Sequence, residues 1–142
     1  MDRALNYMAL ARKAGRIELG EEPVGAAARA LKACLVTVAS DAGDHTWRRA
    51  KSFVAGTNQI AVKLSHTKDE MGQATGRTSL AIAAITDPAM ALAFLKALPG
   101  QEQYSQELEA LENRTNRLAQ RQKEAKAHER NKRLGKSGGK KH

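Results

Sequence analysis

The stretch Gly20-Glu21-Glu22-Pro23-Val24 opens a helical pattern directly after a short apolar segment, Ile17-Glu18-Leu19. Apolar residues then recur on one face of a helix, with the i, i+3, i+4 and i+7 spacing that begins at Val24. Proline suits a first turn because its missing N–H would have no intrahelical partner there, and two acidic side chains suit the positive end of the helix dipole. The stretch predicts the start of an amphipathic helix over about residues 21–33.

Helical and strand patterns alternate along the chain from Asp2 to Leu98. Further helices are predicted over residues 2–14, from the Ser40–Asp44 loop to Gly56, from the Thr67–Glu70 capping box to Gly76, and from Asp87-Pro88 to Pro99. Apolar and β-branched runs predict strands at Leu35–Ala39, Ile60–Val62 and Leu80–Ile85. The last run is apolar throughout, so it is expected at the centre of the sheet. The alternation predicts an α/β domain with helices covering both faces of a sheet.

The composition changes after Pro99-Gly100, which predicts a boundary between a domain of residues 1–98 and an extension of residues 99–142. The extension has eleven Lys/Arg against six Asp/Glu, and it is predicted to be a charged helix that ends in a disordered basic arm. A four-three spacing links Tyr104, Leu108, Leu111, Thr115, Leu118, Gln122 and Ala125. Because only three of these are leucine, any coiled coil is expected to be weak and the protein to be a monomer.

The chain has 142 residues, a formal net charge of +9 and a pI near 10. A positive excess of this size favours a polyanionic partner, either nucleic acid or an anionic membrane surface. Cys34 is the single cysteine, which excludes an intrachain disulfide and a cysteine-based zinc site. No long apolar run and no signal-peptide pattern occur, so we expect a cytoplasmic protein without a membrane partner.

The usual signatures of an enzyme are missing from the sequence. It has no Gly-rich phosphate loop with its lysine, no dinucleotide-binding glycine fingerprint and no histidine spacing typical of metal ligands. Cys34 is interpreted as a small core residue. Asp41 and Asp44 are residue types that loops and helix caps prefer, which favours a structural role over acid–base chemistry. We therefore expect no enzymatic activity, no cofactor and no metal.

Five short runs follow one another between Leu5 and Leu98: Leu10–Gly15, Gly20–Val24, Lys32–Val36, Leu35–Asp41 and Thr67–Gly76. In order and spacing they resemble the kink-turn-binding ribosomal protein family of the 7Ae/30e type, and most of all its short stand-alone bacterial branch. The C-terminal extension has no part in this resemblance. The resemblance implies a three-layer α-β-α sandwich with a small mixed sheet of about four strands. It also implies binding of a sharply bent RNA without catalysis.

The resemblance further implies which residues contact RNA. In that family the N-terminus of the second helix enters the RNA groove, a surface that corresponds here to Gly20, Glu21, Glu22 and Pro23. The loop before the last strand covers an extruded base, and that loop corresponds to Arg77, Thr78 and Ser79. Free N–H groups at a helix start can bind phosphate or base oxygens, and a carboxylate can accept hydrogen bonds from guanine.

The chain departs from the family pattern at the helix start. Where members typically have Asn-Glu and a lysine one turn later, this sequence has Glu22, Pro23 and Ala26. Contacts to the RNA backbone are therefore expected from Arg29 and Lys32 in the second helix, and from the basic arm. Arg16, beyond the first helix, is a further candidate that would serve either RNA or the helix dipole.

The sequence thus predicts a non-catalytic protein that binds structured RNA, associated with the ribosome or with another RNA. An alternative is a protein-interaction module that self-associates through the C-terminal helix, with its charge serving solubility. A third interpretation is the substrate-binding domain of an RNA ribose methyltransferase. That reading would need a further domain of about 150 residues, for which the chain has no room.

Overall fold

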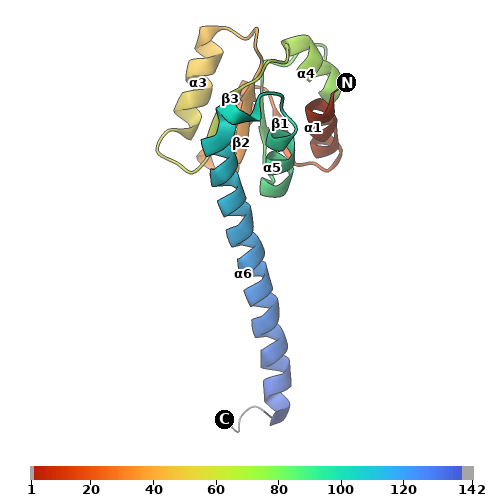
Figure 1. Cartoon of the computed structure of the whole chain (residues 1–142), viewed down its shortest axis with the longest axis vertical. Coiled ribbons are helices and arrows are strands. Elements are labelled where there is room, and N and C mark those ends of the chain that lie inside the picture. Colours follow the sequence, from red (N-terminus) through yellow and green to blue (C-terminus); the bar gives the residue numbers. More distant parts are fainter. Residues whose placement is uncertain (1, 139–142) are drawn as a thin grey trace.

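The computed structural model describes residues 2–138, and the side chains of residues 2–100 and 103–128 (Figure 1). Its sheet has four strands: β1 (Ile17–Leu19), β2 (Leu35–Val38), β3 (Ile60–Lys63) and β4 (Ile82–Ile85). The strand order is β1-β4-β2-β3, with β4 antiparallel to both of its neighbours and β2 parallel to β3. All residues of β2 and β4 are buried, which confirms that the apolar run at 80–85 supplies a central strand.

The helices cover both faces of this sheet (Figure 1). On one face α1 (Arg3–Lys13) packs against α4 (Lys68–Thr75) and α5 (Pro88–Lys96), and on the other α2 (Glu21–Arg29) packs against α3 (Asp44–Val54). The two helical layers enclose a single apolar core around Met8, Val36 and Phe94. The fold is the predicted three-layer α-β-α sandwich with a mixed sheet.

The predicted helix starts at Thr67 and Asp87 are confirmed. The hydroxyl of Thr67 accepts from the amide of Glu70, whose carboxylate accepts from the amide of Thr67, so both halves of the capping box are formed. Asp87 accepts from the amide of Met90, with a proline in the first turn. These side chains bind amides that have no partner within the helix, which is why the two helices begin there.

Helix α2 ends at Arg29, four residues before the predicted end. Leu31 takes a left-handed conformation with φ of 59°, and its amide and that of Lys32 bind carbonyls of the last turn. The buried side chain of Gln59 then accepts from the amide of Ala33 at 2.9 Å and donates to the carbonyl of Ala28 at 3.2 Å. The prediction was wrong because this contact comes from a residue far along the chain, which the alanine-rich run does not reveal.

The C-terminal extension forms a short 3-10 helix, η1 (Gln101–Tyr104), and the long helix α6 (Ser105–Gly138). The first turns of α6 pack on α5, where Leu111 is fully buried and Leu108 is partly buried. The hydroxyl of Tyr104 donates to the carbonyl of Lys63 at 3.1 Å. Leu108 and Leu111, which belong to the four-three spacing, therefore complete the core of their own chain.

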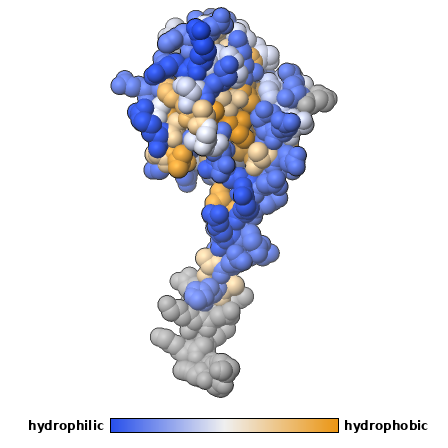
Figure 2. Space-filling view, turned by 90° about the vertical axis from the view of Figure 1, so that its left-hand side faces the viewer, coloured by the Kyte–Doolittle hydropathy of each residue, from blue (hydrophilic) through white to orange (hydrophobic). Residues whose placement is uncertain are grey.

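Beyond these turns α6 projects away from the globular part (Figure 1), and residues 119–128 are exposed. The described part of this projection is mostly hydrophilic (Figure 2). The disordered arm predicted at the very end of the chain falls in part on residues 139–142, which lie outside the described residues. A charged helix is present as predicted, and it runs without a break to Gly138.

Replacing Asp2 with alanine is expected to lower the free energy of unfolding by about 1 kcal/mol, through the loss of an N-cap. The Asp2 carboxylate accepts from the amide of Leu5 at 2.9 Å and lies 2.6 Å from Nε2 of the buried His66. Burial by itself raises the pKa of Asp2, but these two hydrogen bonds bring it below its usual value of 3.8.

This stabilisation is therefore present above about pH 4 and is lost as the pH falls through the lowered pKa. Urea unfolding at pH 7 and at pH 3 measures both effects. Asp2→Asn is the control, because it keeps a capping acceptor but cannot titrate. A wild-type stability that falls no faster on acidification than that of Asp2→Asn would contradict the prediction.

Candidate nucleic-acid interface

The start of α2 and the loop between α4 and β4 meet at one end of the sheet. The amide of Gly20 donates to the carbonyl of Ile82 at 3.0 Å, which joins the end of β1 to the start of β4. A Cβ atom placed on Gly20 would lie 3.7 Å from Nη1 of Arg77. Gly20 has φ of 100°, a conformation that only glycine adopts without strain. The two segments that the sequence predicted to contact RNA therefore lie side by side.

The loop of residues 77–79 is held against α4 by close backbone packing at Gly72. A Cβ on Gly72 would lie 2.8 Å from the carbonyl oxygen of Arg77 and 2.8 Å from the amide nitrogen of Ser79. The amide of Arg77 also donates to the carbonyl of Gly72 at 2.8 Å, after Gly76 has turned the chain with φ of 78°. The position of the loop thus depends on a site where only glycine fits.

The side chains at this end are exposed and mostly uncommitted. The side chains of four residues make no hydrogen bond or ion pair with any residue that the structure describes: Glu22, Arg77, Thr78 and Ser79. Glu21 differs, because its Oε1 accepts from Nε of Arg49 on α3 at 2.6 Å. Both members of that pair are about half exposed, so the pair orients the two side chains more than it stabilises the fold.

A hollow of about 410 Å³ lies between the starts of α2 and α3, lined by Glu21, Glu22, His45 and Arg49. Both helices begin at this end, so their unpaired amides and the positive ends of their dipoles face the same space. Helix starts attract anionic groups, whereas the two glutamates that line this hollow repel them. The two glutamates at its edge add hydrogen-bond acceptors, which suit the amino and imino groups of a base.

The other three predicted site residues lie elsewhere. Lys32 precedes β2, and the carbonyl of Arg16 accepts from the amide of Thr86 after β4, which places both residues at the opposite end of the sheet. Nη1 of Arg29 lies 3.4 Å from where a Cβ on Gly25 would be, so its side chain folds back along α2. All three are exposed. The structure therefore separates them from the residues at the α2 start.

Arg12, His45 and Arg49 belong to this interface but were missing from the predicted set. A Cβ on Gly76 would lie 2.6 Å from Nη1 of Arg12, so this guanidinium lies directly beside the 77–79 loop. Arg49 reaches Glu21 from another helix. The spacing of cations along α1 and α3 carries no information about these contacts, which arise only when the layers assemble.

Asp41 and Cys34 have structural roles in the fold. Asp41 accepts from the amide of Lys68 at 2.8 Å at the start of α4. Burial raises the pKa of the Cys34 thiol, so this cysteine stays protonated inside the core. Among the side chains of residues 2–100 and 103–128, no group of three or more metal-ligating residues comes together. None of the helices within residues 2–138 has the length and apolarity needed to cross a membrane.

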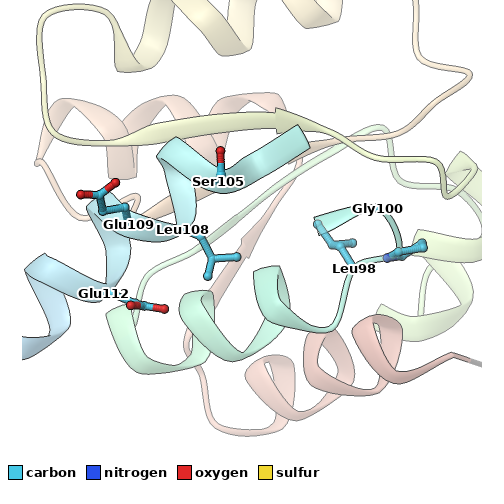
Figure 3. Close-up of a pocket in the computed structure, with 7 residues that line it drawn as sticks. Leu98, Gly100, Ser105, Leu108, Glu109 and Glu112 are labelled. Carbon is cyan, nitrogen blue, oxygen red and sulfur yellow. The ribbon is translucent and has the colours of Figure 1, made fainter. Parts of the chain in front are cut away.

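A pocket of about 710 Å³ lies between the end of α5 and the start of α6 (Figure 3). Leu98 and Leu108 give it an apolar floor, and Figure 3 shows the carboxylates of Glu109 and Glu112 on its α6 side. Glu112 lies 3.6 Å from the ammonium group of Lys96. The acidic edge makes this pocket a poor site for a phosphate group.

No protein-family model matches the chain, and none of the curated proteins does. Among solved structures, the chain is similar to a protein of unknown function from Bacillus halodurans, with a TM-score of 0.64 and 22% identity over 68% of this chain and 97% of that one. It is also similar to the Giardia lamblia 15.5kD RNA binding protein, with a TM-score of 0.57 and 19% identity over 75% of this chain and 85% of that one. At these identities the likeness shows a shared fold.

Proposed function

We propose that this protein is a non-catalytic RNA-binding protein that recognises structured RNA at the end of the sheet where α2 begins. The observation that carries the proposal is the meeting of two segments distant in sequence. Gly20–Pro23 and Arg77–Ser79 lie side by side, and the exposed side chains of Glu22 and of Arg77–Ser79 have no partner in the described part of the chain. A surface of unpaired donors and acceptors beside helix starts suits the mixed chemistry of phosphates and base edges.

Two further observations support RNA as the partner. The chain carries a net charge of +9. The guanidinium group of the exposed Arg77 lies next to the start of α2, and that of the exposed Arg12 lies beside the 77–79 loop. Cations placed in this way bind the RNA backbone and release counterions. The shared fold adds weight, because the Giardia lamblia protein of this fold is an RNA binding protein.

In this proposal the RNA is kink-turn-like. An unpaired, bent RNA exposes bases whose edges and faces are accessible to side chains, unlike a regular RNA helix. Glu22 accepts hydrogen bonds from a guanine, because it is exposed at the first turn of α2 and has no competing partner among the described residues. Arg77, Thr78 and Ser79 cover a base extruded at the bend. Ribosome association follows the same interpretation, since ribosomal RNA is rich in such structures.

Glu22→Gln is expected to weaken binding to a kink-turn RNA by about 1–3 kcal/mol and to change binding to an unbent duplex little. The glutamine keeps the size of the side chain, but one of its two terminal groups is a donor and faces the donors of guanine. Filter binding at one fixed salt concentration measures both affinities. If Glu22 served only the helix dipole, removing its charge would leave RNA binding unharmed or slightly stronger. The free energy of unfolding would then fall by about 0.3 kcal/mol.

Ala26→Lys is the companion variant, because Ala26 is exposed one turn after Glu22 where family members typically have a lysine. We expect it to strengthen binding to the kink-turn RNA more than binding to the duplex. Equal gains on both RNAs would mean that this face of α2 does not contact a bend. In that case general RNA binding would remain and kink-turn recognition would be wrong.

A further inference from the structure

We propose a second binding site, for the phosphodiester backbone of RNA, in a pocket between α6 and the turns that follow α2 and α3. The pocket has a volume of about 470 Å³, and three arginines of α6 line it: Arg114, Arg117 and Arg121. This site rests on the proposed function, because it would hold a distal part of the same RNA. Leu31, which lines it, precedes β2, so the pocket lies at the end of the sheet opposite to the start of α2.

The charge of the lining points to an anionic ligand. Its charged residues are the three arginines, and no aspartate or glutamate lines it. The pocket at the end of α5 is different, since two glutamates line that one. A concentration of positive charge inside a recess raises the local concentration of anions. Arginine guanidinium groups also match the oxygens of phosphate in geometry, and they bind them through two parallel hydrogen bonds.

Arg114, which lines the pocket, carries an unsatisfied hydrogen-bond donor. Its Nη1 atom is buried and has no hydrogen-bond partner among the described residues. A buried donor without a partner costs free energy, so a native structure usually satisfies it with another group. Because Nη1 is not accessible from the pocket in this conformation, the guanidinium must rotate toward the pocket before a phosphate oxygen can supply the missing acceptor. Arg117 and Arg121, which are exposed and unpartnered in the described part of the chain, would bind the same chain of phosphates.

The turn after α2 gives the pocket an apolar wall. Leu31 lines it, with 60% of its surface exposed and a left-handed backbone where glycine is the usual residue. Leu118 faces the same space from α6. An exposed leucine in a strained conformation does not stabilise an isolated domain, but it can contact the apolar face of a ribose.

The spacing of the arginines favours an oligomeric phosphate over a single one. They occupy positions i, i+3 and i+7 of α6, so they lie on one face and extend over about 10 Å of the helix. One phosphate ion cannot contact guanidinium groups distributed over that length, whereas successive phosphates of a backbone can. Free phosphate is accordingly expected to bind weakly.

The test is a titration of the full chain with an abasic deoxyribose-phosphate hexamer, which has the backbone but no bases, followed through backbone amide NMR shifts. We expect shifts at Leu31, Thr57 and Asn58, and much smaller ones with inorganic phosphate at the same phosphate concentration. Arg117→Gln combined with Arg121→Gln should lower the affinity for the hexamer about tenfold, because charge-assisted contacts are lost. The control pair Lys123→Gln and Lys126→Gln removes the same charge from exposed positions outside the pocket, and should change affinity less than about twofold.

The possible outcomes separate this proposal from the function proposed above. Shifts confined to residues 20–23 and 77–79 would overturn the pocket and leave the α2 interface standing. Equal losses in the two double variants would also overturn it, since they would show a general effect of charge. Shifts at the pocket together with an unaltered kink-turn affinity in Glu22→Gln would support the pocket and count against the α2 interface.

Discussion

Leu111→Asp is expected to lower the free energy of unfolding by more than about 3 kcal/mol, because Leu111 is fully buried where α6 packs on α5. Truncating a buried leucine costs roughly 2–5 kcal/mol by itself, and an unpaired carboxylate in the same place adds a desolvation penalty. This outcome differs from the expectation that the stable domain ends before Pro99. The leucine in question lies in the extension, yet it belongs to the core of the globular part.

Ala119→Asp is the matched control, since it adds the same charge to an exposed position of the same helix. Its expected cost is the difference in helix propensity, below about 1 kcal/mol. Urea unfolding followed by circular dichroism measures both variants. Equal and small effects would contradict the packing of α6 on α5. Truncation after Gly100 should destabilise the protein in the same way. Truncation after Gln122 should not, because it retains Leu111 and removes only exposed residues among the described side chains of α6.

Gly72→Ala is expected to displace the loop of residues 77–79 and to weaken RNA binding without altering any exposed side chain. In a helix, alanine is favoured over glycine by about 1 kcal/mol. The added Cβ, however, would lie 2.8 Å from backbone atoms of both Arg77 and Ser79, which cannot rotate away as a side chain can. Overpacking of this kind costs about 1–3 kcal/mol, so the clash outweighs the propensity and the loop must move.

Because Arg77, Thr78 and Ser79 move together, we expect the affinity for structured RNA to fall by about tenfold or more, the loss of at least one good contact. Gly43→Ala serves as the control, because no atom lies within 4 Å of the Cβ that it would add. A Gly72→Ala protein that is folded and binds RNA as the wild type does would show that the loop is not part of the interface. Differential scanning calorimetry with filter binding separates the effects on stability and on affinity.

Local signals in the sequence were sufficient to predict most helix starts and the central strand. Thr67 with Glu70, and Asp87 with Pro88, are complete capping signals within a few residues, so the structure forms them as predicted. The apolar run that contains β4 is long enough to identify a strand covered on both faces. In contrast, β1 has only three residues, which is too short to show a period. It appears as a strand only because β4 binds it.

Features made by contacts between distant segments were not predictable. The side chain of Gln59 ends α2 early, Arg49 pairs with Glu21 across two helices, and Leu111 enters the core from the extension. The two hydrogen-bonded contacts join residues at least 26 positions apart in the chain. Local sequence patterns do not extend over such a separation. The candidate site shows the same division. The family resemblance indicated its two segments, whereas the separation of Arg16 and Lys32 from them follows from the sheet topology.

The most direct test of RNA binding at the α2 end is ultraviolet crosslinking of the intact protein to RNA in cells, with mass spectrometry of the crosslinked peptides and sequencing of the RNA. We expect crosslinked peptides that contain residues 20–23 and 77–79, on RNAs that share a sharp bend. A preparation without crosslinked RNA, or one in which the crosslinks are confined to residues 101–142, would contradict the proposal that this end of the sheet recognises RNA.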